Sequence, residues 1–371
     1  MLDDTMGYLA GVITGGIAFA KMRSKIAYLL VFCYAWILFG LNTFNLDYEN
    51  YQARFNGAGG LISEPIFLFL LKVFRKAGFS YQSFLFVYAF VCLALISVIV
   101  LKYSPYPAAV LFLYLIFPFC LETVQIRFFL AEAIVIAAAC LILKYKVSTN
   151  PLLVIGYLVL IALATGIHYS AVFYLIFLVL FLNEERFSFI QYVMIPVLFA
   201  GVCIALPLFF ELAGSFIGME KANAWISGIE KASMTRVMRL IIVRGGMLFL
   251  CLIARHLPWR EDVMYDEDKE ANAFDRTLFL LTMYSMLFTL LEISLSSSYE
   301  RLTRPGLLFG WIYISRRISL TDRLTKLTMW ILMLGLTFVN FYTNLFMGVG
   351  RGGTPLFQSV FLCMFQNNAL F

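Results

Sequence analysis

The chain has 371 residues, of which 62% are hydrophobic and only 13% are charged, and its formal net charge is +6. Soluble globular proteins carry about 25% charged residues, so this chain has too few to cover a surface that faces water. The composition therefore excludes a soluble enzyme, a nucleic-acid-binding protein, a disordered protein and a disulfide-stabilised secreted domain. It predicts an all-α polytopic membrane protein embedded in the lipid bilayer.

Apolar segments follow one another along the chain, and a helix of about 20 apolar residues crosses a bilayer. We place about twelve spans, at residues 7–20, 26–42, 82–101, 107–121, 128–143, 151–166, 170–182, 188–210, 237–254, 277–293, 305–315 and 328–346. The first and the eleventh are short enough to be half-spans or tilted helices. Because no internal repeat and no long linker interrupts the series, we expect one membrane domain over residues 1–371.

The charges of the loops predict the orientation of the spans. An outer N-terminus puts short basic loops such as 21–25 and 315–327 in the cytoplasm, as the positive-inside rule requires. The acidic loop 255–276 is then cytoplasmic, and the loops 43–81 and 211–236 lie outside. We therefore expect a multi-pass membrane protein whose N-terminus lies on the outer side.

The outer loop 43–81 contains a predicted amphipathic helix. From Glu64 onward, apolar residues recur with helical spacing and basic residues occupy the last turn, a pattern typical of a helix that lies at the membrane interface. Ser63 can cap this helix and Pro65 suits its first turn. We expect Glu64 to lie beside the polar segment that precedes it in the same loop.

That polar segment, NLDYENY, directly follows the second span. Aromatic side chains stack on sugar rings, and amides hydrogen-bond sugar hydroxyls, so Tyr48, Asn50 and Tyr51 are candidate substrate-binding residues. Asp47 or Glu49 is a candidate general base. The alternative is an interfacial belt of tyrosines around a polar turn.

A further polar segment, ETVQIR at residues 122–127, separates two spans with almost no loop between them. Arg127 therefore lies near membrane depth and needs an anionic partner. Glu122 is one candidate partner and a substrate phosphate is another, because guanidinium groups bind phosphate oxygens well. Gln125 is a candidate substrate-binding residue.

Two later segments complete the polar set. His168, one of two histidines, lies between two spans with Tyr169 beside it, and it could orient a hydroxyl or accept its proton. Arg301 and Arg304 lie on one face if that segment is helical, and repeated arginines at one membrane face suggest binding of a pyrophosphate. Further candidates near this face are Arg239, Arg244 and Glu292.

Taken in chain order, these motifs resemble the EpsG family, the Wzy-type polymerases of exopolysaccharide and capsular repeat units. The resemblance covers about residues 26–310. It is carried by DYxNY (Asp47, Tyr48, Asn50, Tyr51), EP (Glu64, Pro65), QIR (Gln125 to Arg127), HYS (His168 to Ser170) and RxxR (Arg301, Arg304).

The resemblance implies a GT-C-like glycosyltransferase that joins repeat units carried on undecaprenyl diphosphate, at the outer (periplasmic) face of the bacterial cytoplasmic (inner) membrane. It implies no metal, no cofactor and no nucleotide sugar. A chain-length regulator and a flippase of the same pathway are possible partners. Arginines would stabilise the leaving diphosphate, with Arg127, Arg301 and Arg304 as first candidates. The base is left open between Asp47, Glu64 and His168.

Two other functions remain open at this level. A lipid-linked oligosaccharide flippase also needs many spans and buried cations, but it would be expected to consist of two similar halves. An O-antigen-type ligase or a membrane O-acyltransferase would share the membrane setting but not the reaction. The segment 348–353 has the spelling GxGxxG, but no predicted strand precedes it, so a dinucleotide site is not expected.

Overall fold

A computed structural model describes residues 2–58, 64–182, 184–216, 233–257, 269–348 and 354–370. Its named secondary-structure elements are all helices, and Asn42 and Asn368 form an isolated β-bridge. The all-α prediction is confirmed for these residues. Ser63, Arg351, most of the loop 211–236 and half of the loop 255–276 lie outside the described residues.

The helices follow the predicted apolar segments closely. In the first half of the chain they are α1 (Leu2–Ala20), α2 (Lys25–Gly40), α3 (Tyr48–Phe55), α4 (Pro65–Lys76), α5 (Tyr81–Tyr103), α6 (Pro107–Ile116), α7 (Phe119–Glu122), α8 (Ile126–Ser148), α9 (Leu152–Ile167) and the 3₁₀ helix η1 (Tyr169–Phe181). In the second half they are α10 (Glu184–Phe189), η2 (Ile190–Met194), α11 (Ile195–Phe216), α13 (Met234–Leu240), η3 (Ile241–Gly245), α14 (Gly246–His256), α15 (Lys269–Leu287), α16 (Thr289–Ser294), η5 (Ser297–Thr303), α17 (Arg304–Ser319), α18 (Arg323–Leu345), η7 (Phe357–Leu362) and α19 (Cys363–Gln366).

Six helices among the described residues are long and apolar enough to cross a membrane, and each coincides with a predicted span. They are Tyr81–Tyr103, Ile126–Lys146, Arg186–Ala205, Arg236–His256, Asn272–Ser294 and Arg323–Leu345. Five more predicted spans correspond to shorter apolar helices of 10–17 residues. The helices therefore support a multi-pass membrane protein, with six full-length candidate spans where the sequence predicted about twelve.

The predicted span 107–121 is not a single helix. α6 ends at Ile116, and α7 begins only at Phe119. Pro118 has no backbone N–H and cannot continue the hydrogen-bond ladder of a helix, so the chain breaks before it. The break places Glu122 at the end of the short helix α7, immediately before the turn that leads into α8.

The predicted eleventh span is the buried helix α17. Trp311, near its middle, is 1% exposed, and α17 packs against α15 and α14. Both Gly306 and Gly310 lie where a Cβ atom would collide with a neighbouring helix, which shows how closely these helices approach. Because protein surrounds it, α17 is not constrained to the length or the apolar composition of a lipid-facing span.

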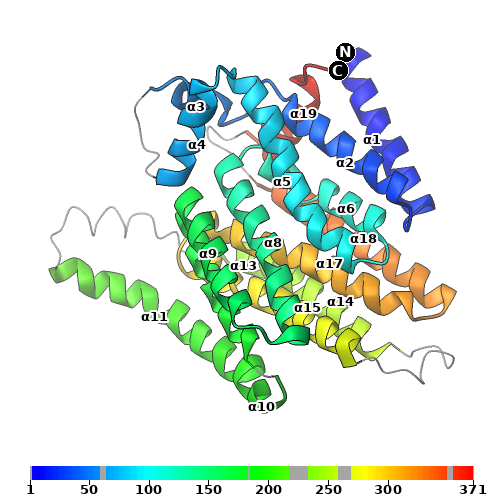
Figure 1. Cartoon of the computed structure of the whole chain (residues 1–371), viewed down its shortest axis with the longest axis vertical. Coiled ribbons are helices and arrows are strands. Elements are labelled where there is room, and N and C mark those ends of the chain that lie inside the picture. The colour runs from blue at the N-terminus through cyan, green and yellow to red at the C-terminus, as the bar shows by residue number, and fades with distance from the viewer. Residues whose placement is uncertain are drawn as a thin grey trace.

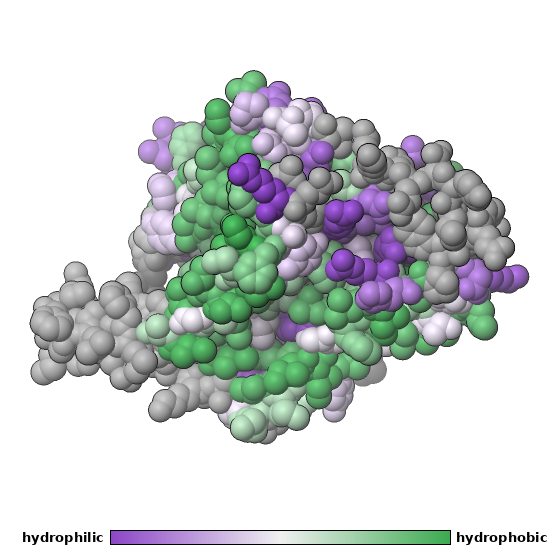
Figure 2. Space-filling view, turned by 90° about the horizontal axis from the view of Figure 1, so that it is seen from below, coloured by the Kyte–Doolittle hydropathy of each residue, from purple (hydrophilic) through white to green (hydrophobic). Residues whose placement is uncertain are grey.

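The two sides of the helix assembly differ in their surroundings. In α8, 83% of the apolar stretch that is long enough to cross a membrane is buried inside the protein. In the helix Arg186–Ala205, only 11% of the corresponding stretch is buried. α11 lies at the lower left of Figure 1, at the periphery of the assembly, and its Val197 is 64% exposed. Large hydrophobic areas of this kind also dominate the described surface in Figure 2, as expected for a surface that faces lipid.

The loop 43–81 is more ordered than predicted. The expected amphipathic helix is α4, with Glu64 at its N-cap position and Pro65 in its first turn. A second helix, α3, precedes it, and α3 packs on α4 while α4 packs on α9. Figure 1 shows α3 and α4 above the upper ends of α8 and α9. These two helices thus carry the polar segment NLDYENY and Glu64 to the start of α8.

Candidate functional site

The polar segments meet at one end of the helix assembly. Arg127 lies in the first turn of α8 and Arg304 is the first residue of α17, while His168 links α9 to η1. Three polar segments far apart in the sequence thereby lie at helix starts that are adjacent in space. Two linked networks of contacts result, one around Arg127 and Arg301, and one around Arg304.

In the first network, Arg127 joins α8 to the two helices of the loop 43–81. Its Nη1 atom donates to Oε2 of Glu64 over 2.6 Å, and its Nε atom donates to the hydroxyl of Tyr51 over 3.3 Å. Glu64, not Glu122, is therefore the anionic partner of Arg127. The arginine side chain is 24% exposed, and among the described residues its Nη2 atom has no hydrogen-bond partner.

Tyr51 lies at the centre of several charges. Burial raises the pKa of its phenol, Arg127 opposes this effect, the carboxylate of Asp47 adds to it, and Arg301 opposes it. The four groups therefore lie close enough to influence one another. Asp47 is partly exposed, and within the described part of the chain its carboxylate has no hydrogen bond or ion pair.

The imidazole ring of His168 lies beside the guanidinium group of Arg301. Its Nε2 atom lies 3.3 Å from Nη1 of Arg301, and its Nδ1 atom lies 2.7 Å from the hydroxyl of Ser170. Nδ1 also accepts from the backbone N–H of Ser170 over 3.3 Å, and this contact fixes the orientation of the ring. The imidazole also contacts the ring of Phe128 edge-on, at 5.5 Å between centroids.

The environment of His168 disfavours its charged form. Burial and the nearby guanidinium groups of Arg301 and Arg127 lower its pKa to about 3. The imidazole is therefore neutral near pH 7. It is a weak base that lies in contact with Arg301.

Arg301 differs from the other arginines of the site in its charge balance. Among the described residues, no carboxylate forms an ion pair with it. Its Nε atom donates to the carbonyl of Ser298 over 2.6 Å, and its guanidinium lies 5.7 Å from the centroid of the Phe128 ring. These contacts hold the side chain in place and, among the described residues, do not include a carboxylate.

The second network surrounds Arg304, which is 1% exposed. Its Nη1 atom donates to Glu122 and its Nη2 atom donates to Glu300, both over 2.8 Å. Glu300 also accepts from Nη2 of Arg244 over 3.1 Å, and Arg244 donates through Nη1 to Asn340 over 3.0 Å. Helices α7, α17, η3 and α18 are thereby connected through one buried set of charges.

Glu300 stays ionised within this network. Burial disfavours its charged form, but the guanidinium groups of Arg304 and Arg244 outweigh that cost and hold its pKa at about 2. Glu132, on α8, is 0% exposed and has no ion pair among the described residues. It influences the ionisation of Glu122, so a second carboxyl group borders the Arg304 network.

The remaining predicted site residues have varied surroundings. Tyr48 is buried and donates to Gln82 over 2.9 Å, whereas Tyr169 is 51% exposed and Asn50 is exposed. Gln125 is partly buried at the start of α8. Two more predicted residues bind groups outside the two networks: Arg239 donates to the carbonyl of Thr343 over 3.1 Å, and Glu292 pairs with Arg236 over 3.5 Å.

Sequence reasoning did not select several residues of this site. Glu300 and Asn340 complete the Arg304 network, and Glu132 borders it. A carboxylate in the middle of a predicted span is itself a signal, because such residues are costly in a membrane, and it could have identified Glu132. Within the described residues, no group of three or more histidine, cysteine or acidic side chains is arranged to hold a metal ion.

The comparisons with known proteins agree with these motifs. The family model described as EpsG family matches residues 25–355, which is most of the chain. The chain therefore belongs to the EpsG family, which is implicated in exopolysaccharide biosynthesis. No curated protein and no solved structure matches it.

Proposed function

We propose that this member of the EpsG family is a polysaccharide polymerase. It would transfer the growing glycan from undecaprenyl diphosphate to a hydroxyl of the next lipid-linked repeat unit, at the outer face of the cytoplasmic membrane. The acceptor oxygen forms a bond to the anomeric carbon, and the bond between that carbon and the phosphate oxygen breaks. The lipid diphosphate leaves with the electron pair, and a base takes the hydroxyl proton.

One observation carries this proposal: Arg301, which forms no ion pair with a described carboxylate, lies beside the neutral His168 and close to Arg127. A leaving diphosphate gains negative charge as its bond to the sugar breaks, and pre-positioned cations stabilise that charge. Arg301 and the unpaired Nη2 atom of Arg127 are suited to contact it. His168 holds Arg301 in position without adding a charge.

Arg304 has a different role in this proposal. Its charge is balanced by Glu122 and Glu300 in a fully buried setting, so we assign it as a positioning residue. It anchors the start of α17 immediately after η5, the 3₁₀ helix that carries Arg301. Arg244 shares Glu300 with it and extends the anchor to α18.

Asp47 is the base that the geometry favours. Glu64 is engaged by Arg127, and the low pKa of His168 makes its imidazole a weak proton acceptor. The Asp47 carboxylate is partly exposed, has no partner among the described residues, and shares Tyr51 as a neighbour with both arginines. The exposed ring of Tyr169 would stack on a sugar and the exposed amide of Asn50 would hydrogen-bond its hydroxyls, whereas the buried Tyr48 and Tyr51 would support the site.

The test compares the surface glycan of a deletion strain that expresses the wild type, Arg301→Ala or Asp47→Asn at matched membrane abundance. A polymerase predicts that the glycan ladder collapses to single repeat units in both variants. Arg186→Ala, which changes an arginine distant from the motifs, should leave the ladder intact. Full-length polymer from both variants would contradict the assignment. Loss of all surface glycan, with lipid-linked units retained inside the cell, would instead indicate a flippase.

A further inference from the structure

A cavity of about 190 Å³ lies at the other end of α17 from the candidate site. Arg304 begins that helix and Arg317 borders the cavity near its end, so at 1.5 Å per residue the two are about 20 Å apart along the axis. The walls of the cavity come from the ends of α14 and α17, the start of α15, and η2. None of its lining residues belongs to the two networks described above.

Asp275, the one carboxylate among the described residues that line the cavity, is already neutralised. Asp275 accepts from Nε of Arg316 at 2.5 Å, and Nη1 of Arg317 lies 3.7 Å from its other oxygen. Arg317 also donates to the backbone carbonyls of Ala254 and Arg255, which ties the end of α14 to α17. Among the described lining residues, the negative charge of Asp275 thus faces two guanidinium groups, and the charges of the other two lining arginines remain in excess.

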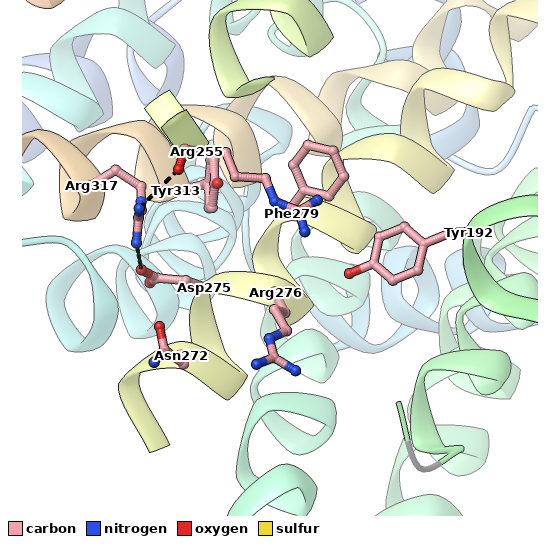
Figure 3. Close-up of a pocket in the computed structure, with 8 residues that line it drawn as sticks. All are labelled: Tyr192, Arg255, Asn272, Asp275, Arg276, Phe279, Tyr313 and Arg317. Carbon is pink, nitrogen blue, oxygen red and sulfur yellow. Dashed lines mark hydrogen bonds and ion pairs between the residues drawn. The ribbon is translucent and has the colours of Figure 1, made fainter. Parts of the chain in front are cut away.

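Arg255 and Arg276 supply that excess. Both side chains are exposed, and among the described residues Arg276 has no hydrogen bond or ion pair. The guanidinium of Arg255 lies 5.7 Å from the centroid of the Phe279 ring. Figure 3 shows the hydroxyl of Tyr192 pointing toward the space that both guanidinium groups border. Two cations and a hydroxyl therefore converge on one opening.

The cavity is lined mostly by polar or charged residues, and a polar area is also present on the face of the protein that is seen from below. Figure 2 shows hydrophilic residues gathered on one part of that face, while most of the other described surface is hydrophobic. The cavity is smaller than the roughly 300 Å³ of pockets for drug-sized ligands, which favours a small anion or a headgroup over a nucleotide. Guanidinium groups match the geometry of phosphate oxygens, and hydroxyl and amide groups such as those of Tyr192 and Asn272 can complete their hydrogen bonding.

We propose that this cavity is a binding site for one phosphate group, held by Arg255 and Arg276. The phosphate belongs either to the headgroup of an anionic phospholipid or to a small free phosphate compound. Because α14 and α15 carry the two arginines and both helices pack on α17, a bound phosphate would hold three helix ends together. The proposal is independent of the function assigned to the opposite end.

The test uses the purified full-length protein in an uncharged detergent. The double variant Arg255→Gln/Arg276→Gln is compared with the wild type and with Arg323→Gln, which removes an exposed arginine at the start of α18 outside the cavity. Binding of radiolabelled inorganic phosphate and pyrophosphate is measured by equilibrium dialysis. Retention of added phosphatidylglycerol or phosphatidylcholine is counted by native mass spectrometry, and melting temperatures verify that all three proteins are folded.

We expect the double variant to bind at least about tenfold more weakly, because each lost guanidinium removes charge-assisted hydrogen bonds, and Arg323→Gln to behave as the wild type. Saturable binding of phosphate or pyrophosphate identifies a free phosphate compound as the ligand. Selective retention of one phosphatidylglycerol, without binding of the free anions, identifies a lipid headgroup. Equal binding of both ligands by the wild type and the double variant, or no binding of either by the wild type, would overturn the proposal.

Discussion

Arg127 and Glu64 are 63 residues apart in the sequence, and their side chains meet over 2.6 Å between Nη1 and Oε2. The pair joins the first turn of α8 to the N-cap of α4, so it holds the loop 43–81 against the helix assembly. Glu64 is nearly buried by this contact, with a side chain that is 7% exposed, whereas Arg127 keeps access to solvent. The same arginine can therefore position the loop and bind an anion.

Replacing Arg127 by lysine tests both of these roles. Lysine keeps the charge but cannot contact Glu64, Tyr51 and a phosphate through one planar group. We expect polymer formation to fall by about 10²- to 10³-fold, as for the loss of one donor to a developing charge. The measurement is the glycan ladder at matched protein abundance. Lys72→Gln, an exposed change on α4, should leave the ladder unchanged, and an intact ladder from Arg127→Lys would argue against a contact with substrate.

Two buried carboxyl groups on neighbouring helices should respond differently to the same substitution. Glu122→Gln leaves the buried Arg304 with Glu300 alone, and breaking a buried ion pair costs about 3 kcal/mol or more. Glu132→Gln breaks no ion pair among the described residues, so we expect its effect to stay within about 1 kcal/mol. Unfolding in detergent by a denaturant titration measures both. Equal losses would show that Arg304 does not depend on Glu122.

His168 predicts a specific dependence of stability on pH. Its pKa is about 3 in the folded protein, below the value of 6.5 for an ordinary histidine. Below pH 6.5 the unfolded chain therefore binds a proton that the folded protein does not, and stability falls as the pH decreases from about 6.5 to about 3. The slope from this one group is about 1.4 kcal/mol per pH unit.

The comparison that isolates this effect uses the two histidines of the chain. His168→Gln should reduce the loss of unfolding free energy between pH 7 and pH 5. His256→Gln, at an exposed position at the end of α14, should retain the slope of the wild type. Identical slopes for wild type and His168→Gln would mean that the buried imidazole is already charged.

Glycine substitutions test how closely the helices approach. A Cβ atom at Gly306 would lie 2.5 Å from Cβ of Ser285 on α15, whereas one at Gly335 on α18 would meet nothing within 4 Å. We expect Gly306→Ala to lower the free energy of unfolding by about 1–3 kcal/mol through overpacking. Gly335→Ala should raise it by up to about 1 kcal/mol, because alanine favours a helix. Stabilisation by both substitutions would show that α17 and α15 are less tightly packed.

The choice of ion-pair partners could not be read from the sequence. Glu122 lies five residues before Arg127, and proximity made it a reasonable partner. The turn between α7 and α8 separates the two side chains, and Glu122 instead faces Arg304, 182 residues further along the chain. Contacts of this kind depend on how helices pack, and sequence spacing predicts contacts only within one helix.

The sequence also could not predict which helices are buried inside the protein, because burial too depends on how helices pack. Hydropathy reports the composition of a segment but not its neighbours. It therefore did not distinguish α17, which is surrounded by protein, from the lipid-exposed part of α11. Pro118, by contrast, is visible in the sequence, and its missing N–H is a signal of a break that our single predicted span 107–121 did not take into account.

The sequence by itself determined the helical class, the positions of most apolar segments and the five polar motifs of the family. It could do so because a bilayer leaves helices as the way for an apolar chain to satisfy its backbone, and because polar groups are costly there. Only the tertiary structure decided which charged side chains form ion pairs with one another and which do not. It buries Arg304 between two carboxylates and leaves Arg301 beside a neutral imidazole, since packing between helices, and not composition, sets the partner of each charge.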